Sequence, residues 1–371
     1  MPHSGAYHIP GLRELAPRRI LLCQLRQIGD VVLLTPSIHM LRKRYPDAAI
    51  DVYTEKKCAP VLENNPEVRH VWKLDKGLSL LASIGFYRQV GRGPDGLGYD
   101  LIIDFQQLPR IRWMLLFARC RFKFSTPPPW YNVAFYTHWA PGSGPYAAKC
   151  KAGMLMKGLG IPWNNDPPRI YLSIAERARA DELLAAWGVG QGETLVSVDA
   201  THRRVSRCWP AKHYAGLLRL VAQARPDVRF LLLYGPGELD VVRQVAALAD
   251  LGGRVMVPPD MLSLREMAAV LARVRLHLGN CSSPRHFAVA VGTPTLTLRG
   301  STSSAWTYPG PGQEDVSLGL PCQPCSEGEC PIGLRCLAEL TPELVLPRVL
   351  TLLEGAEKPV LQGYDGDCGC S

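Results

Sequence analysis

Short apolar runs alternate with longer amphipathic segments along this chain, and this alternation limits its possible folds more than any other feature. Several runs are almost continuously hydrophobic, as parallel strands covered on both faces are. The segments between them, such as 211–226 and 263–274, have apolar residues at helical spacing. We therefore expect an α/β fold of doubly wound parallel sheets. The predicted strands are 18–23, 49–54, 70–74, 99–105, 194–198, 228–234, 254–258, 275–279 and 293–299.

A Pro-rich stretch at 160–173 interrupts the alternation and divides the 371 residues into halves of similar size. We expect an N-terminal extension at 1–17, a first α/β domain at 18–165 and a second at 166–345. A helix end and a flexible Gly-rich tail would follow at 346–371. Two domains of this kind are common in enzymes that close over a nucleotide-bearing substrate.

The composition is that of a soluble globular protein, with 47% hydrophobic and 20% charged residues. No apolar run approaches the roughly 20 residues that span a bilayer, and the start of the chain lacks the apolar core of a secretory signal. We therefore expect a cytoplasmic protein, whose twelve cysteines are thiols or metal ligands. The net charge of +9 suits an anionic partner, although a solvated basic surface explains it equally well.

A Gly29-Asp30 pair follows the first predicted strand. Gly29 would allow a tight turn there, leaving Asp30 at the carboxyl end of the strand, where α/β sheets bind their ligands. A carboxylate in that place can act as a general base toward a hydroxyl nucleophile. Asp is also a common helix N-cap residue, and the stretch alone leaves both interpretations open. Thr35-Pro36 indicates a later helix start or a kink.

The segment 279–300 predicts a strand followed by a short helix. Ser282 or Ser283 is a suitable N-cap, and Pro284 suits the first helical position. The free amides at such a helix start attract anions, and a diphosphate fits this chemistry. His286, one turn into the helix, either reaches the same anion or is a hydrogen-bonded structural histidine.

Three arginines, Arg203, Arg204 and Arg207, lie in a predicted loop between a strand and a helix. They could neutralise phosphate charge on a leaving group, or simply be solvated. Glu238 follows another strand and either caps the next helix or contacts a ribose or base. Four cysteines, Cys322, Cys325, Cys330 and Cys336, fall within fifteen residues. Such spacing suits a structural zinc or iron site, or a set of free thiols in a compact loop.

Taken in order, these motifs resemble glycosyltransferase family nine, the ADP-heptose:lipopolysaccharide heptosyltransferases and their relatives. The resemblance runs from about residue 18 to about residue 350, and each motif is moderately specific by itself. The segments that carry it are 25–68, 99–106, 208–218, 279–302 and 322–345.

The resemblance implies a GT-B fold, with two Rossmann-like domains facing a central cleft. It also implies inversion at the sugar carbon without a catalytic metal. Asp30 matches the family's general base, and Arg207 stands where a lysine is usual. The donor, most simply ADP-heptose, would bind the second domain, with its diphosphate at Ser282 and Ser283. Asp104, Gln106 and Arg110, at another strand end of the first domain, are candidates for contact with a phosphorylated lipid A–core acceptor. Peripheral contact with an anionic inner membrane would follow from such an acceptor.

One departure from the family concerns donor recognition. The family motif at 279–286 is Gly-x-Asp-Ser/Thr-Gly-x-x-His, but this chain has Cys281 for the aspartate and Ser283 for the glycine. A thiol is a poor acceptor for a sugar hydroxyl, and losing that hydrogen bond costs about 1–3 kcal/mol.

Three alternatives therefore stand beside heptose transfer to a lipopolysaccharide core. The first, favoured by Cys281, is the same mechanism with another donor or acceptor. The second is a nucleotide-sugar-binding relative without turnover, against which the intact Asp30 argues. The third is a nucleic-acid-binding protein, but no recognition motif for nucleic acid is found.

Overall fold

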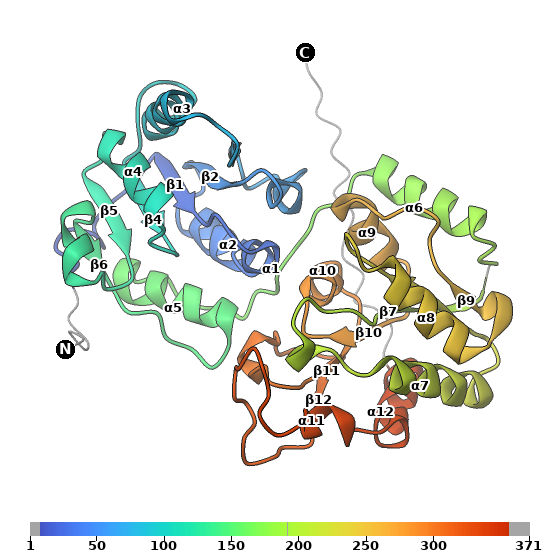
Figure 1. The fold of residues 1–371 in the computed structure, drawn as a ribbon. Helices are drawn as coiled ribbons and strands as arrows, with labels where there is room; N and C mark the ends of the chain where they lie inside the picture. Colours follow the sequence, from blue (N-terminus) through green and yellow to red (C-terminus); the bar gives the residue numbers. More distant parts are fainter. Residues whose placement is uncertain (1–7, 191, 356–371) are drawn as a thin grey trace. The chain divides into compact units, whose positions relative to one another are not determined.

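The computed structural model describes residues 8–190 and 192–355, and the chain divides into two α/β units between Arg169 and Ile170 (Figure 1). The first unit is called unit 1 and the second unit 2. The Gly-rich tail predicted to be flexible lies, from residue 356 on, outside the described residues. Each unit has one six-stranded sheet whose paired strands all run parallel.

Unit 1 has the strand order β3-β2-β1-β4-β5-β6. Its strands are β1 (Arg19–Cys23), β2 (Ala49–Glu55), β3 (His70–Leu74), β4 (Leu101–Asp104), β5 (Phe122–Ser125) and β6 (His138–Trp139). Its helices are α1 (Ile28–Val32), α2 (Thr35–Arg44), α3 (Leu80–Arg92), α4 (Pro109–Phe117) and α5 (Ala147–Leu159), with 3-10 helices η1 (Ala59–Leu62) and η2 (Trp130–Phe135). Helix α3 packs with α4 on one side of the sheet, and α2 with α5 on the other (Figure 1).

Unit 2 repeats this plan with the order β12-β11-β10-β7-β8-β9. Its strands are β7 (Thr194–Asp199), β8 (Val228–Leu233), β9 (Val255–Met256), β10 (Leu276–Asn280), β11 (Thr295–Leu298) and β12 (Gln313–Val316). Its helices are α6 (Ile174–Ala186), α7 (Ala211–Ala224), α8 (Leu239–Ala249), α9 (Leu264–Leu271), α10 (Ser283–Ala290), α11 (Arg335–Ala338) and α12 (Pro342–Glu354), with 3-10 helices η3 (Val205–Arg207), η4 (Gly252–Arg254) and η5 (Ser304–Trp306).

The strand order has a direct consequence for ligand binding. In each unit the chain reverses its direction of winding at one pair of neighbouring strands, β1 and β4 in unit 1 and β7 and β10 in unit 2. Open parallel sheets bind ligands outside the carboxyl ends of the strands at this switch point. The segments after β1, β4, β7 and β10 are therefore the first places to look for functional groups.

All nine strands predicted from the sequence are present, with ends shifted by a few residues, whereas β5, β6 and β12 were not predicted. Strand β6 has only two residues and β12 is the polar sequence Gln-Glu-Asp-Val. Both are the outermost strands of their sheets, where a continuous apolar run is not required.

The segment after β1 differs from the expected turn. Gly29 and Asp30 lie inside α1, whose N-cap residue is Gln27, so Asp30 is not the cap but occupies the third helical position. Its carboxylate accepts a hydrogen bond from the Gln27 backbone N–H at 3.3 Å. Thr35 and Pro36 start the next helix, which confirms the predicted later helix start rather than a kink. No helix within residues 8–190 and 192–355 is long and apolar enough to cross a membrane.

Candidate active site

Asp30 lies at the switch point of unit 1, one helical turn after the loop that leaves β1. While one carboxylate oxygen faces the start of α1, the other lies 3.4 Å from the ammonium of Lys151 on α5. Lys151 also donates a hydrogen bond to the Gln24 side-chain oxygen at 2.8 Å and lies over the Phe105 ring. The Asp30 side chain is 19% exposed, so it is held firmly and still reaches solvent.

The side chain of Gln106, two residues after the end of β4, holds the loop before α1 in place. The Gln106 side-chain oxygen accepts hydrogen bonds from the backbone N–H groups of Leu25, at 2.9 Å, and Arg26, at 3.1 Å. Gln24 donates to the carbonyl of Arg26, so side chains bind the loop from both sides. These contacts set the position at which α1 starts and hence where the carboxylate of Asp30 lies.

The three residues predicted to contact an acceptor have different surroundings. Asp104 is buried, and its carboxylate accepts hydrogen bonds from Tyr136 Oη, at 2.6 Å, and from the backbone N–H groups of Gln106 and Gln107. Burial raises the pKa of Asp104, and the hydrogen bonds oppose this shift. Asp104 and Gln106 thus shape the loops around Asp30, while Arg110 is partly exposed near the start of α4.

In unit 2 the expected helix start is found at the end of β10. Ser282 is the N-cap residue of α10, Ser283 is its first residue and Pro284 its second, one position later than predicted. Instead of capping its own helix, the Ser282 hydroxyl donates a short hydrogen bond to the carboxylate of Asp199. The backbone amides of the first turn of α10 are therefore not satisfied by the Ser282 side chain.

Arg207 interacts electrostatically with Cys281, which lies just before this helix start. Its guanidinium is half-buried; burial lowers its pKa, Arg204 adds to this effect, and Cys281 opposes it. Arg207 Nε is buried without a hydrogen-bond partner among the described residues. Arg203 and Arg204 are exposed. Leaving a buried guanidinium nitrogen unpaired is costly, and a phosphate oxygen would satisfy it.

Sequence reasoning missed Asp199, the last residue of β7. It lies beside Gly279 in the pairing of β7 with β10, and Thr201 Oγ1 lies 3.3 Å from one of its oxygens and donates at 2.7 Å to Glu238. Burial raises the pKa of Asp199 to about 7. The hydrogen bond from Ser282 acts against this increase in pKa, and the nearby Glu238 adds to it. Glu238 stands at the N-cap position of α8 but accepts from the Gly235 backbone N–H instead of capping.

The raised pKa predicts a pH-dependent stability. From about pH 4 to pH 7 the folded chain keeps a proton on Asp199 that the unfolded chain releases, so stability falls as pH rises through this window. Asp199→Asn removes the effect. The free energy of unfolding of the variant, relative to that of wild type, should therefore be about 1–3 kcal/mol higher at pH 8 than at pH 5. Urea unfolding of both proteins at the two pH values measures it, and an equal difference at both would contradict the assignment.

Cys281 and His286 lie on either side of the start of α10, and both are buried. Burial lowers the pKa of His286 well below its usual value, and the charge of Arg285 acts in the same direction. His286 is therefore a neutral imidazole, able to donate a hydrogen bond to an anion but not to form an ion pair with it.

The four clustered cysteines, Cys322, Cys325, Cys330 and Cys336, all line one small cavity of unit 2. Burial raises the pKa of Cys336, and the other three cysteines add to the shift. Residues 317–334, which carry three of the four, contain no helix or strand. Within residues 8–190 and 192–355, no three His, Cys, Asp or Glu side chains are gathered as a ready-made set of metal ligands.

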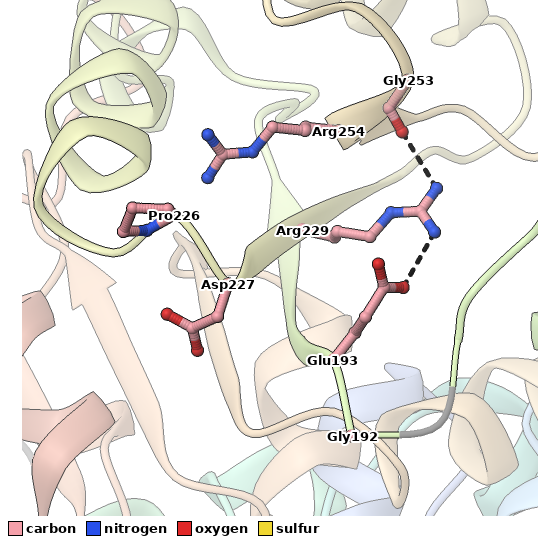
Figure 2. A pocket seen from close by; sticks show the side chains of 7 residues that line it. All are labelled: Gly192, Glu193, Pro226, Asp227, Arg229, Gly253 and Arg254. Atoms are coloured by element: carbon pink, nitrogen blue, oxygen red, sulfur yellow. Dashed lines mark hydrogen bonds and ion pairs between the residues drawn. The ribbon is translucent and has the colours of Figure 1, made fainter.

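A separate hollow of unit 2 contains two arginines, Arg229 and Arg254 (Figure 2). Arg229 donates to Glu193 and to the Gly253 carbonyl, both at 2.9 Å, and Arg254 donates to carbonyls of α7, of the loop after it and of β8. The hollow lies at the amino ends of β7 and β8, whereas Asp199 lies at the carboxyl end of β7. Because the protein itself satisfies these arginines, this hollow is not the anion site.

Two doubly wound parallel sheets of this strand order, with polar groups at the carboxyl ends of the switch-point strands, have the architecture of the GT-B fold. The chain is similar to a glycosyltransferase family 9 structure from Veillonella parvula, with a TM-score of 0.79 and 21% identity over 91% of this chain and 98% of that one. It is also similar to E. coli heptosyltransferase WaaC with ADP-2-deoxy-2-fluoro heptose, with a TM-score of 0.66 and 20% identity over 90% of this chain and 99% of that one.

Sequence comparison gives the family directly. The profile of glycosyltransferase family 9 (heptosyltransferase) matches residues 96–335, more than half of the chain, and the chain belongs to this family. Among curated proteins, lipopolysaccharide heptosyltransferase 3 of Escherichia coli is 27% identical over 301 residues, which cover 77% of this chain and 84% of that protein. The predicted family and the doubly wound GT-B fold are therefore confirmed, and the protein is a glycosyltransferase.

Proposed function

We propose that this glycosyltransferase moves heptose from ADP-heptose to a hydroxyl of a lipopolysaccharide core acceptor, with inversion at the sugar carbon and without a catalytic metal. The observation that carries the proposal is the placement of Asp30 at the switch point of unit 1, held by the start of α1 and by Lys151. The similarity to lipopolysaccharide heptosyltransferase 3 and to a heptosyltransferase with an ADP-heptose analogue supports the choice of donor and acceptor.

In the proposed reaction Asp30 takes the proton of the acceptor hydroxyl as that oxygen bonds to the anomeric carbon. The bond from this carbon to the diphosphate breaks on the opposite face, and ADP leaves with the electron pair. Lys151 keeps the carboxylate of Asp30 in place, since it lies within ion-pair distance of one oxygen. Arg110 is the remaining candidate for acceptor contact, because it is partly exposed.

Unit 2 is proposed to hold the donor. The diphosphate would accept hydrogen bonds from the first amides of α10 and from Arg207, whose Nε lacks a partner among the described residues. The exposed Arg203 and Arg204 would add positive charge. Neutral His286 would donate a hydrogen bond, and Glu238 lies at the neighbouring strand end, where a nucleoside could reach it.

Cys281 favours a second candidate, the same reaction with another nucleotide-sugar donor, because it lacks the carboxylate that the family motif provides. Calorimetric titration with ADP, ADP-heptose, UDP-sugars and GDP-sugars separates the two. Preference for ADP-heptose supports the first candidate, and preference for a UDP- or GDP-sugar supports the second. Binding to none of them would contradict both candidates.

The same titration tests the role of Arg207. We expect Arg207→Met to weaken ADP binding about 10- to 100-fold, because it removes a charge-assisted hydrogen bond to phosphate. Arg207→Lys should recover part of the affinity by restoring the charge. Arg348→Met, at an exposed arginine of α12 in unit 2, is the matched control and should bind ADP as wild type does. Equal affinity of the Arg207→Met and control variants would remove Arg207 from the donor site.

We also propose that the four clustered cysteines hold one thiophilic metal ion, zinc or iron, with a structural role. Their shared cavity and the lack of regular structure in residues 317–334 support this, since metal binding can order such a segment. The thiols would have to move closer together to bind it. Elemental analysis of the purified protein should find about one metal ion per chain, absent from Cys322→Ser/Cys325→Ser. Cys150→Ser, at an exposed cysteine of unit 1, is the control; a wild type free of metal would overturn the proposal.

The proposed acceptor is a lipid-linked, phosphorylated saccharide. The enzyme would then work at the cytoplasmic face of the inner membrane, where the net charge of +9 favours contact with anionic groups.

A further inference from the structure

One layer of unit 1, formed by α3, α4 and η2, exposes large apolar side chains that a monomer would normally bury. The six most prominent are between 57% and 82% exposed. They are Leu80 and Leu81 on α3, Trp113 and Leu116 on α4, and Trp130 and Tyr131 on η2. On the opposite layer, α2 and α5 expose one large apolar side chain among their described residues, Met156 at 36%.

These three elements form one continuous surface. Helix α4 packs against α3 on one side and against η2 on the other. Two cation–π contacts link these elements. Arg88 of α3 lies over the Phe117 ring of α4 at 5.2 Å, and Arg112 of α4 lies over the Phe135 ring of η2 at 5.9 Å. The surface made by the outer sides of α3, α4 and η2 is called the α3–α4 face below.

The charged side chains on α3, α4 and η2 are all basic. No Asp or Glu occurs at 76–94 or at 105–136, and the second stretch, which contains α4 and η2, has five Lys and Arg residues. Arg88 and Arg92 are exposed on α3, and Arg119 and Arg121 are exposed just after α4. Arginines therefore flank the exposed tryptophans and leucines, with no carboxylate on these elements to neutralise them.

We propose that the α3–α4 face docks on the surface of a bilayer of anionic phospholipid. Tryptophan and tyrosine favour the boundary between headgroups and acyl chains, leucines enter the apolar layer, and arginines pair with lipid phosphates. A second copy of the chain is a poor occupant, because a symmetric dimer would bring two uniformly basic surfaces together. A nucleic acid would leave the leucines without an apolar partner.

This inference goes beyond sugar transfer and does not depend on it. Docking through unit 1 would bring the unit that carries Asp30 to the surface where a lipid-linked acceptor lies. Vesicle binding can be measured without any sugar donor, and ADP binding can be measured without vesicles. The docking surface and the proposed activity can therefore fail separately.

The test is co-sedimentation of the full-length protein with vesicles of phosphatidylcholine alone, and with vesicles of equal parts phosphatidylcholine and phosphatidylglycerol. We expect binding to the anionic vesicles that weakens as salt rises. Trp113→Ser/Trp130→Ser should lower partitioning by at least about tenfold, since both side chains lose apolar contact with lipid. Leu80→Ser/Leu81→Ser is a second variant with the same expectation. All four side chains are exposed, so both variants should fold.

Leu248→Ser/Leu344→Ser, two exposed leucines of unit 2, is the matched control and should bind vesicles as wild type does. ADP binding should be unchanged in every variant. The proposal is overturned if wild type does not bind anionic vesicles, or if the tryptophan variant binds them as tightly as the control. Lipid-independent self-association of wild type that the tryptophan variant loses would assign the face to a second copy instead.

Discussion

Asp30→Asn is expected to lower kcat by about 10²- to 10⁴-fold, because an amide cannot accept the proton of the acceptor hydroxyl. The amide oxygen can still accept the hydrogen bond that the Gln27 backbone N–H makes to Asp30, so α1 should start at the same place. ADP affinity should be unchanged, since this donor ligand is assigned to unit 2. The measurement is single-turnover transfer from the donor that calorimetry selects.

The matched control for this variant is Asp47→Asn, an exposed aspartate of unit 1, which should transfer sugar at the wild-type rate. Lys151→Met should reduce the rate by a smaller factor, because it removes the ion pair but leaves the carboxylate. If Asp30→Asn kept more than about a tenth of the wild-type rate, another group would have to accept the proton and the base assignment would be wrong.

Arg285→Met is expected to destabilise unit 2 by about 3 kcal/mol, the largest effect on stability that we expect. Arg285 lies on α10 and is 1% exposed. Its guanidinium donates to the hydroxyls of Thr297, at 3.3 Å, and Thr307, at 3.0 Å, and makes a short hydrogen bond to the Trp306 carbonyl. Asp315 lies 3.6 Å away. Methionine fills much of the volume but leaves these buried acceptors without their donor.

Denaturant unfolding measures this effect, and Arg348→Met is the matched control. Arg348 is exposed and lies 3.8 Å from Glu314, so removing it should change stability by less than about 1 kcal/mol. Asp315 keeps a second partner, Arg299, which limits the loss in Arg285→Met. An equal, small effect of both substitutions would mean that the buried contacts of Arg285 are replaced by water.

The sequence by itself was sufficient for the parts of this protein that local pattern controls. Runs such as 228–234 became buried parallel strands because a strand covered on both faces needs apolar residues throughout. The Ser-Ser-Pro triplet marked the start of α10 to within one position, since serine caps and proline preorganises a helix start. Asp30 was predicted to be a site residue because it follows a strand end, whereas its place inside α1 was not predicted.

The tertiary structure decided which distant residues meet. Asp199 was missed because only the pairing of β7 with β10 brings its carboxylate to Ser282, 83 residues away. Lys151 reaches Asp30 from α5, far along the chain, and Gln106 fixes the loop before α1 from the end of β4. The apolar part of the α3–α4 face could not be predicted either, because a sequence does not tell which tryptophans and leucines remain exposed in the folded chain. Periodicity records the surroundings of a residue along its own element, whereas such contacts depend on strand order and register, which follow from packing of the whole sheet.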